Sequence, residues 1–501
     1  MNLINNMTDA LRDGIRNFLK LEPAQKNSIT IQENLDYFGN AGVNRIWYRG
    51  DGDELSQLYK NLSGDTNQAR FWAAVPSAGM HIRKIHTGLP GIIVSVLAAI
   101  VISDMNDIAM DNDGGFKDIW EKHIAKENNF NHLVKHAISE TLVIGDGAFK
   151  ISLDTNISKY PIIEFVSGEN VEYVMKRGRI QAVIFNTPYE HNKKKYVLKE
   201  EYGYGYIASK LMLDGKEVDL NCITETEGLK SNVTFDKSFC MAVPFKIYES
   251  TKWKDRGKSI FDGKQDAFDA FDESWSQWID ALRKGRTKEY IPSCMIPRSP
   301  ETGEYLRPNP FDNAYFECES DMGETSKYEI KTVQPAIPHE SYLATYITAL
   351  DLCLQGIISP STLGIDTKKL DNAEAQREKE KTTLYTRNNI VEALQETLPI
   401  LVDVVNKTYS VMNKQSLKDL VVDIPFGEYA NPSFESQVET VGKGKTQGIM
   451  SIEAAVEELY GDTKDEEWKK EEVARLKAEQ GIVTDEPEVQ VADELKNKIG
   501  F

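Results

Sequence analysis

The chain has 501 residues, more than the roughly 250 to 300 at which a single core stops growing, so we expect about two to four domains. Its 41% hydrophobic and 27% charged residues are typical of globular proteins and exclude a disordered or integral membrane chain. The net charge of −19 argues against a broad basic surface that wraps nucleic acid, because such binding depends on Lys and Arg neutralising phosphates. The same charge is compatible with a surface past which DNA slides without binding.

The five cysteines lie far apart and form no C-x-x-C pair, which predicts reduced structural thiols and no metal or disulfide framework. Residues 1–20 carry charges every few positions and no continuous apolar segment. They therefore do not form a secretory signal, and we expect an intracellular protein. The longest apolar run, Leu89–Ser103, is shorter than the about 20 residues that span a bilayer, so it predicts a buried helix and no membrane role.

The N-terminal half begins with helical patterns and then changes to strands. Apolar residues recur at helical spacing over residues 3–20, a mixed segment follows over 30–72, and helices are predicted near 90–103 and 120–144. Gly145-Asp146-Gly147 is interpreted as a stop signal for the last of these helices. Residues 148–248 alternate with period two between turn pairs such as Arg177-Gly178, which predicts an antiparallel meander.

A helix predicted over residues 260–286 has two different faces. One is apolar and includes Phe268, Phe271, Trp275 and Trp278, and the other is acidic, with Asp262, Asp266, Asp269, Glu273 and Asp280 three, four or seven apart. Most charged helix faces are simply solvated. This helix, however, pairs with a second one at about 338–355 across a separate module, and two such helices form a stalk, which favours a channel lining.

The module between the two helices, residues 289–337, contains six prolines and short alternating stretches that predict a small β-rich unit. A loop-like segment follows at 356–371, and then a helical pattern runs from Asn372 to about Met412. Pro399 lies inside it, and because an interior proline costs roughly 3 kcal/mol we expect a kink or break near Thr397. The remaining predictions are a strand at 417–424, three helices at about 433–443, 451–460 and 464–480, and a loose acidic tail from Thr484.

No catalytic signature stands out. His132 and His136 are four apart on a predicted helix, but a third metal ligand is missing. Gly444-Lys445-Thr446 matches only the end of a P-loop, because Glu439 stands where its first glycine is required and the preceding segment is helical. We therefore expect no catalytic residues, no metal and no cofactor.

Five segments, in this order, make the chain resemble the portal proteins of tailed bacteriophages, in particular those of long-tailed phages of Gram-positive hosts. None is a short catalytic motif, so the resemblance depends on their order and spacing over most of the chain. The segments are ETLVIGDGAFKISLD (140–154), KDRGKSIFDGKQDAFDAFDESWSQWIDALRKGR (254–286), GIISPSTLGID (356–366), EAQREKEKTTLYTRNNIVEALQETLP (374–399) and GIMSIEAAVEELYGDTKDEEWKKEEVARL (448–476).

The resemblance implies an α+β multidomain subunit with a wing, a helical stem, a small β-rich clip and a helical crown. By position, it divides the chain into a wing (1–259), stem helix 1 (260–286), clip (287–337), stem helix 2 (338–356), tunnel loop (357–371), wing return with a long helix (372–430), crown (431–480) and acidic flexible tail (481–501). The crown is short for the family, which leaves its form open.

The function implied is a non-enzymatic dodecameric ring at one capsid vertex, assembled in the host cytoplasm and present in the virion. Double-stranded DNA would pass through it during packaging and ejection. Its other partners would be the terminase large subunit, a head-completion or adaptor protein, and the major capsid and scaffolding proteins. Besides the acidic face, Lys368 and Lys369 are candidate DNA contacts, the four aromatic residues of the apolar face are candidate subunit contacts, and Arg298 and Arg307 are candidate clip contacts.

The residues alone leave two other classes of protein open. One is a different head-tail connector or baseplate ring protein. The other is a metal-dependent nucleotidyl- or phosphotransferase that uses the mixed region 120–250, with Asp262 and Asp266 as metal ligands. The native mass would separate them, because an enzyme is expected to form a small oligomer and a portal a ring of about twelve chains.

Overall fold

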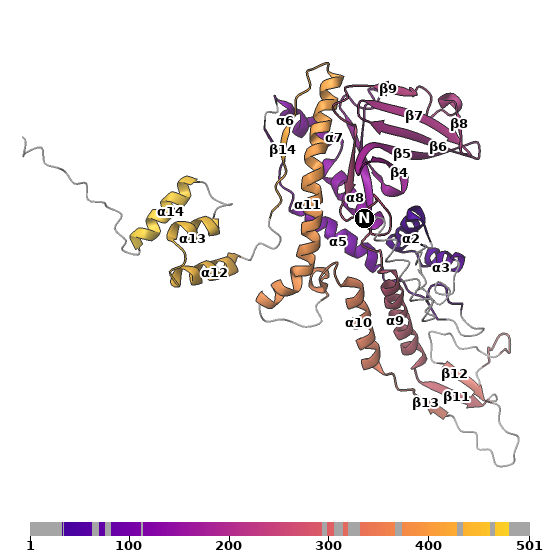
Figure 1. Ribbon diagram of the computed structural model, residues 1–501. Helices are drawn as coiled ribbons and strands as arrows, with labels where there is room; N and C mark the ends of the chain where they lie inside the picture. Colours follow the sequence, from indigo (N-terminus) through magenta and orange to yellow (C-terminus); the bar gives the residue numbers. More distant parts are fainter. Residues whose placement is uncertain are drawn as a thin grey trace, which may run out of the picture. The chain divides into compact units, whose positions relative to one another are not determined.

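The computed structural model combines helices with mainly antiparallel sheets, which confirms the α+β class (Figure 1). The chain divides into two units, Met1–Pro425 and Phe426–Phe501. The structure describes residues 33, 35–62, 70–75, 82–111, 114–292, 298–304, 314–318, 331–365, 373–427, 434–460 and 466–479. The predicted helix at 3–20 and the acidic tail lie outside these residues.

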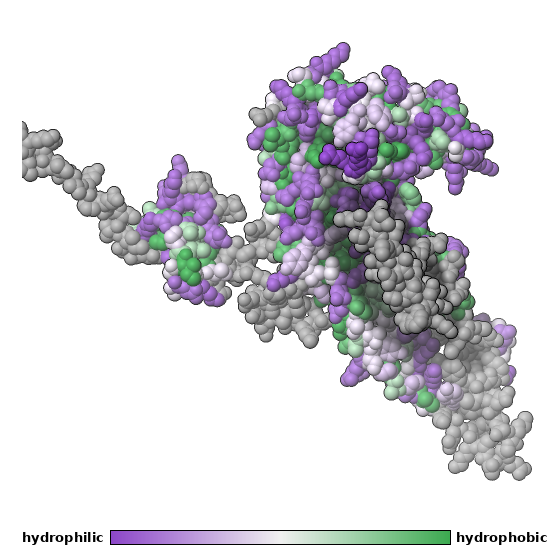
Figure 2. Space-filling model, in the orientation of Figure 1, coloured by the Kyte–Doolittle hydropathy of each residue, from purple (hydrophilic) through white to green (hydrophobic). Residues whose placement is uncertain are grey.

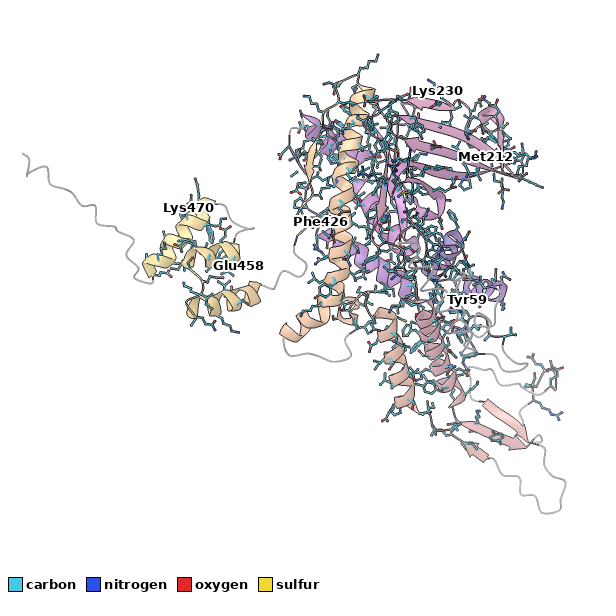
Figure 3. All side chains as sticks on the ribbon, in the orientation of Figure 1. Tyr59, Met212, Lys230, Phe426, Glu458 and Lys470 are labelled. Atoms are coloured by element: carbon cyan, nitrogen blue, oxygen red, sulfur yellow. The ribbon has the colours of Figure 1, made fainter. Side chains whose placement is uncertain are left out.

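Two short helices lie where the sequence predicted only a mixed segment. Helix α2 (Tyr37–Arg49) starts at Asp36, whose carboxylate accepts a hydrogen bond from the Gly39 amide, and it ends at Gly50 with φ 73°. Helix α3 (Gly52–Asn61) is capped in the same way by Asp51. Side-chain oxygens at these positions satisfy amides that the first turn leaves free. Figure 3 shows the side chain of Tyr59 on α3.

The predicted apolar helix is α5 (Leu89–Ser103), with Pro90 in its first turn. It packs against α8 (Phe130–Ile144) and α11 (Ala373–Met412), and Ile93, Val94 and Leu97 are fully buried. Among the described residues, no helix is both long and apolar enough to cross a membrane.

The helix predicted over 120–144 is interrupted. Helix α6 (Phe116–Ile119) continues into a π-helical turn (Trp120–Ile124) and α7 (Ala125–Glu127), and α8 starts only after Asn129, which has φ 47°. Gly145, with φ 117°, ends α8 as predicted. A side chain there would collide with the backbone of Gly257, since a Cβ would lie 2.6 Å from its carbonyl oxygen.

The strands after Gly145 form two sheets, so the prediction of one meander over 148–248 is only partly correct. In the first sheet, β2 (Asp146–Ser152) lies between β3 (Ile162–Ser167) and β10 (Ala242–Lys246), both antiparallel to it. The second is the predicted meander, and Figure 3 shows Met212 on its strand β7. Its strands are β4 (Val171–Lys176), β5 (Arg179–His191), β6 (Lys194–Gly203), β7 (Tyr206–Leu213) and β8 (Lys216–Val218), with β9 (Asn232–Thr234) paired to β7.

A helical hairpin follows the sheets. Helices α9 (Gln265–Lys284) and α10 (His339–Leu354) pack against each other and are about 30 and 24 Å long at 1.5 Å per residue. Between them in the sequence, β11 (Lys288–Pro292) pairs in parallel with β12 (Ala314–Cys318) and antiparallel with β13 (Lys331–Val333). The described part of this module is therefore a small sheet.

Helix α11 runs through Pro399 without ending, so of the kink or break predicted near Thr397 the break is wrong. Leu394, Leu398, Leu401 and Val402 are buried around the proline, and we attribute the continuity of the helix to this packing, which offsets the lost hydrogen bond. Beyond α11, β14 (Val421–Asp423) pairs with β1 (Ala109–Asp111). This pairing brings residues 421–423 next to the N-terminal half of the first unit. Figure 2 shows hydrophilic residues over much of the visible face of its sheets.

The second unit contains the three helices that the sequence predicted, α12 (Phe434–Thr446), α13 (Ile452–Tyr460) and α14 (Glu466–Glu479). Its small core includes Val441, Ile452, Ala455 and Val456. Lys469, which is nearly buried, pairs with Glu457 across α13 and α14.

Candidate functional site

The acidic residues of α9 are the first part of the candidate site, and the best-bonded of them is Asp272, which the sequence analysis did not select. Its carboxylate is 1% exposed and has four partners. They are the Trp72 indole N–H at 3.2 Å, the His86 Nδ1 at 2.6 Å, and the Thr87 amide and hydroxyl at 3.0 and 2.9 Å. Asp272 therefore ties α9 to segments almost two hundred residues earlier.

Asp269 and Asp262 also bond within the chain. Asp269, 7% exposed, accepts hydrogen bonds from the amides of Phe71 and Trp72 at 2.9 and 3.3 Å. Burial raises its pKa, and the two amides oppose that rise. Asp262 accepts from the side-chain amides of Asn40 and Asn44. Asp266 pairs with Arg70, so three of the five predicted channel carboxylates bond to the N-terminal part of the same chain.

The predicted acidic face is therefore not one uniform exposed surface. Asp269 cannot contribute to it from its buried position, and Asp280, 9% exposed, forms an ion pair with Lys284 at 2.6 Å. The Asp266 side chain is 81% exposed and pairs with Arg70, and Glu273 is half-buried beside Gln277. Asp266 is the exposed member of the set, and Asp262 and Glu273 are half-buried.

The aromatic residues of α9 mostly contact their own chain. Phe268 and Phe271 are 1% and 3% exposed, so the interpretation of these two as subunit contacts is wrong. Phe268 packs on Trp47 and Phe261, and Phe271 packs on Tyr346 of α10. The physical reason is that the stripe faces both the N-terminal helices and α10.

Trp275 and Trp278 are only partly buried. Both contact Tyr346, with ring centroids 5.6 and 6.1 Å apart, and Trp278 also stacks on Tyr342. These two residues hold α9 to α10 and keep part of their surface accessible. They remain candidates for a contact with a second subunit.

The reactivity of the Cys353 thiol tests how this hairpin packs. It is buried in α10, and burial raises the pKa of its thiol to about 12. Cys222 is exposed. Because the thiolate is the reactive form, iodoacetamide should label Cys222 in the native protein and leave Cys353 unmodified until denaturant is added. Peptide mass spectrometry measures both, and rapid labelling of Cys353 in native protein would contradict the packing of α10.

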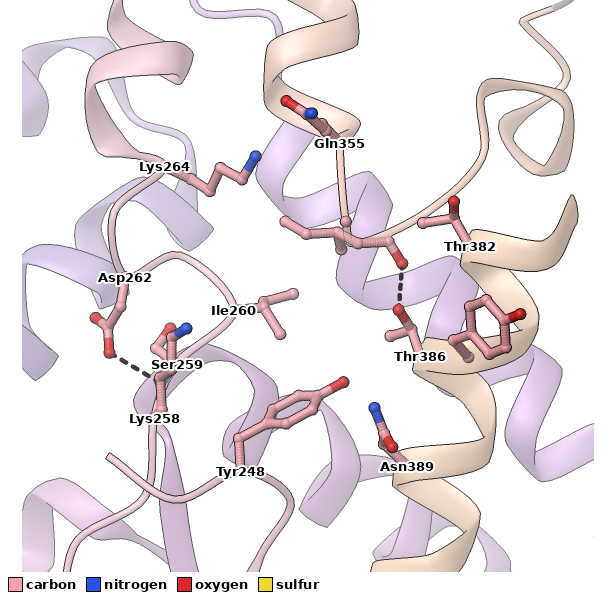
Figure 4. Close-up of a pocket in the computed structure, with 13 residues that line it drawn as sticks. Tyr248, Lys258, Ser259, Ile260, Asp262, Lys264, Gln355, Thr382, Thr386 and Asn389 are labelled. Carbon is pink, nitrogen blue, oxygen red and sulfur yellow. Dashed lines mark hydrogen bonds between the residues drawn. The ribbon is translucent and has the colours of Figure 1, made fainter. Parts of the chain in front are cut away.

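The segment after α10 is attached to α11. Gly356 has φ 76° and turns the chain, and the amide of Ser359 then donates to the Thr383 hydroxyl at 2.9 Å. The Thr386 hydroxyl donates to the Ile357 carbonyl at 2.6 Å (Figure 4). The described part of the predicted tunnel loop, residues 357–365, is therefore attached by its backbone to the long helix. Lys368 and Lys369 lie outside the described residues.

A cavity of about 370 Å³ lies beside this attachment (Figure 4). Residues just before α9, just after α10 and in the first half of α11 contribute to its wall. Lys264, one of the lining residues, donates to the Leu352 carbonyl at 2.8 Å. The polar lining residues include Tyr248, Lys258, Lys264, Gln355, Tyr385 and Asn389.

A second buried cluster joins α2 to the sheets and was also missed. Asp146 is fully buried and accepts from the Tyr37 hydroxyl, the Arg256 guanidinium and the Gly257 amide at 2.9, 2.9 and 2.7 Å. Arg256 also donates to the carbonyls of Val171 and Gly168 at 2.7 and 2.6 Å. The sequence signals were Asp146, which is flanked by glycines, and the pair Arg256-Gly257. They did not show that Asp146 and Arg256 contact each other, because the two residues lie 110 positions apart.

The remaining sequence candidates bring no catalytic group together. Arg298 is described, whereas Arg307 is not, and His132 and His136 are exposed. Gly444-Lys445-Thr446 lies inside α12 and so forms no phosphate-binding loop. Within the described ranges, no group of three or more His, Cys, Asp or Glu side chains could hold a metal ion. Asp262 and Asp266, the metal ligands of the transferase hypothesis, bond to different partners.

No protein-family model matches the sequence, and no curated protein matches it. Solved structures give distant likenesses. A chain in the neck of a native GTA particle, computed with C12 symmetry, has a TM-score of 0.39 and 13% identity, covering 75% of this chain and 91% of that chain. A chain in the neck of an empty GTA particle, computed with C6 symmetry, has the same TM-score and identity, with coverages of 73% and 88%. Both TM-scores are too low to establish a shared fold.

Proposed function

We propose that this chain is the subunit of a portal ring, which forms the DNA channel at one vertex of a phage capsid. The observation that supports it best is the helical hairpin α9–α10, interrupted by a small sheet and anchored to a sheet-bearing body through carboxylates of α9. A short attached turn, a 40-residue helix and a separate three-helix unit follow in the order that the sequence resemblance implies.

The proposed mechanism is physical. Carboxylates on a channel wall repel the phosphate backbone, so DNA can slide with few points of attachment. Asp266 and Glu273 are the accessible candidates on α9, and Lys368 and Lys369 would supply brief contacts with phosphates. The terminase would supply the ATP-driven force, docking on the module of β11, β12 and β13, where Arg298 and Arg307 are candidate contacts.

The oligomeric state tests this proposal. The purified full-length protein should form rings of about twelve chains, because each hairpin presents partly exposed aromatic rings to a neighbour. Native mass spectrometry and negative-stain images measure the number of chains and the central channel. A monomer or dimer at micromolar concentration would contradict the ring, and a ring that never docks a terminase in a packaging reaction would favour a different connector.

A further inference from the structure

One end of the β4–β8 sheet concentrates positive charge. Strands β4 and β5 are joined at Arg177 and Gly178, which have φ 53° and 73°. Positive φ at both central residues is the requirement of a two-residue type I′ turn, the tight connection that matches strand twist. This turn holds Lys176, Arg177 and Arg179 on a short ribbon, and all three are exposed. The cations are thus displayed on a constrained backbone.

Two more residues lie at the same end of the sheet. Ala182 of β5 pairs with Gly203 of β6, so the β6–β7 turn emerges beside the β4–β5 turn (Figure 1). That turn exposes Tyr204, which is 55% accessible. Lys237 packs directly on Gly205, since a Cβ there would lie 2.8 Å from its Cα and Cγ. The cationic sheet end is defined as Lys176, Arg177, Arg179, Tyr204 and Lys237.

Like charges face each other on this surface. Lys176 and Arg179 are directly opposite each other on β4 and β5, an arrangement that destabilises a strand pair. Across the described ranges, no carboxylate forms an ion pair with the four cations of the cationic sheet end. Asp236, next to Lys237 in the sequence, accepts a hydrogen bond from the Ser238 amide, and Glu201 accepts one from the Tyr206 hydroxyl.

We propose that the cationic sheet end binds the phosphate backbone of double-stranded DNA. Guanidinium groups match phosphate oxygens with paired hydrogen bonds, and two of the four cations are arginines. An anion on this surface would also remove the repulsion between Lys176 and Arg179. The site lies on the sheet and not on the α9–α10 hairpin, and it needs neither a ring nor a channel, so it goes beyond the proposed function.

The salt dependence of DNA binding tests the site. A fluorescein-labelled duplex of arbitrary sequence is titrated with the full-length protein and with a Lys176→Gln, Arg177→Gln, Arg179→Gln variant. Each phosphate contact contributes a slope of about −0.9 in log K against log salt, so the variant should lose up to about 2.7 of that slope over about 50 to 200 mM salt. Its affinity at the lowest salt should fall at least about tenfold.

A matched control carries Lys126→Gln, Lys135→Gln and Lys254→Gln, three exposed lysines elsewhere with the same change in charge. It should keep the wild-type slope. Equal slopes in all three proteins, or an equal loss in the control, would overturn the proposal. Loss of binding to poly-L-glutamate with DNA binding unchanged would assign the surface to an acidic protein instead. Negative-stain images of the same variant report ring formation separately, so failure of the site and failure of the portal proposal are distinguishable.

Discussion

Replacing Asp272 with Ala should lower the free energy of unfolding by about 3 to 5 kcal/mol, because it removes the acceptor of four groups that are buried or partly buried. A buried donor left without a partner costs about 1 to 3 kcal/mol, and the Trp72 indole and the Thr87 amide would both be left so. Urea unfolding followed by tryptophan fluorescence measures the change, with Trp72 itself next to the substitution.

Asp266→Ala is the control for this variant. It removes a carboxylate from the same helix, but one whose side chain is 81% exposed, whereas that of its partner Arg70 is 14% exposed. Because water solvates the exposed carboxylate, its ion pair should contribute about 1 kcal/mol or less, so this variant should lose much less unfolding free energy than Asp272→Ala. If Asp272→Ala cost no more than Asp266→Ala, the anchoring of α9 by Asp272 would be refuted.

Ring assembly should also differ between the Asp272→Ala and Asp266→Ala proteins. An α9 released from Trp72, His86 and Thr87 no longer holds the hairpin in a fixed orientation on the body. The Asp272→Ala protein should therefore give irregular or incomplete rings in negative-stain images, whereas Asp266→Ala should give regular ones. Regular rings from both variants would mean that ring assembly does not depend on this anchor.

Arg256→Ala should cost about 3 to 5 kcal/mol of unfolding free energy at neutral pH, because it leaves Asp146 charged and unpaired in a fully buried position. The guanidinium also donates to the carbonyls of Val171 and Gly168 and lies over the Tyr37 ring, with 3.7 Å between the guanidinium carbon and the ring centroid. Arg49→Ala is the control, since its side chain is 61% exposed and, within the described part of the chain, forms an ion pair with Glu54 alone.

The cost of Arg256→Ala should depend on pH. Burial raises the pKa of Asp146 and Arg256 opposes that rise, so removing Arg256 raises the pKa further. When the pKa of a carboxyl group is higher in the folded than in the unfolded state, the protein loses unfolding free energy as the pH rises from the unfolded-state pKa to the folded-state pKa. The difference in unfolding free energy between variant and wild type should therefore narrow as the pH falls toward 3.8, the ordinary pKa of Asp. Urea titrations at several pH values measure it, and a constant difference would contradict the role of the Asp146 charge.

The helices and strands themselves were largely determined by local sequence. Gly145 ended α8 because only glycine adopts its backbone conformation so close to Gly257, and the period-two pattern gave the strands of the meander. The three helices of the second unit were found from spacing alone. In each case the signal lies within a few residues, where backbone preference and burial pattern act together.

What the side chains contact was decided by tertiary structure. The spacing of acidic residues on α9 could not show that Asp269 and the unselected Asp272 meet Phe71, Trp72, His86 and Thr87, since those partners lie almost two hundred residues away. Phe268 was assigned to a neighbouring subunit because an apolar stripe does not show which surface covers it. Pro399 stays inside α11 for the same reason. Local sequence sets the free-energy cost of a proline in a helix, but packing against distant segments decides whether that cost is offset.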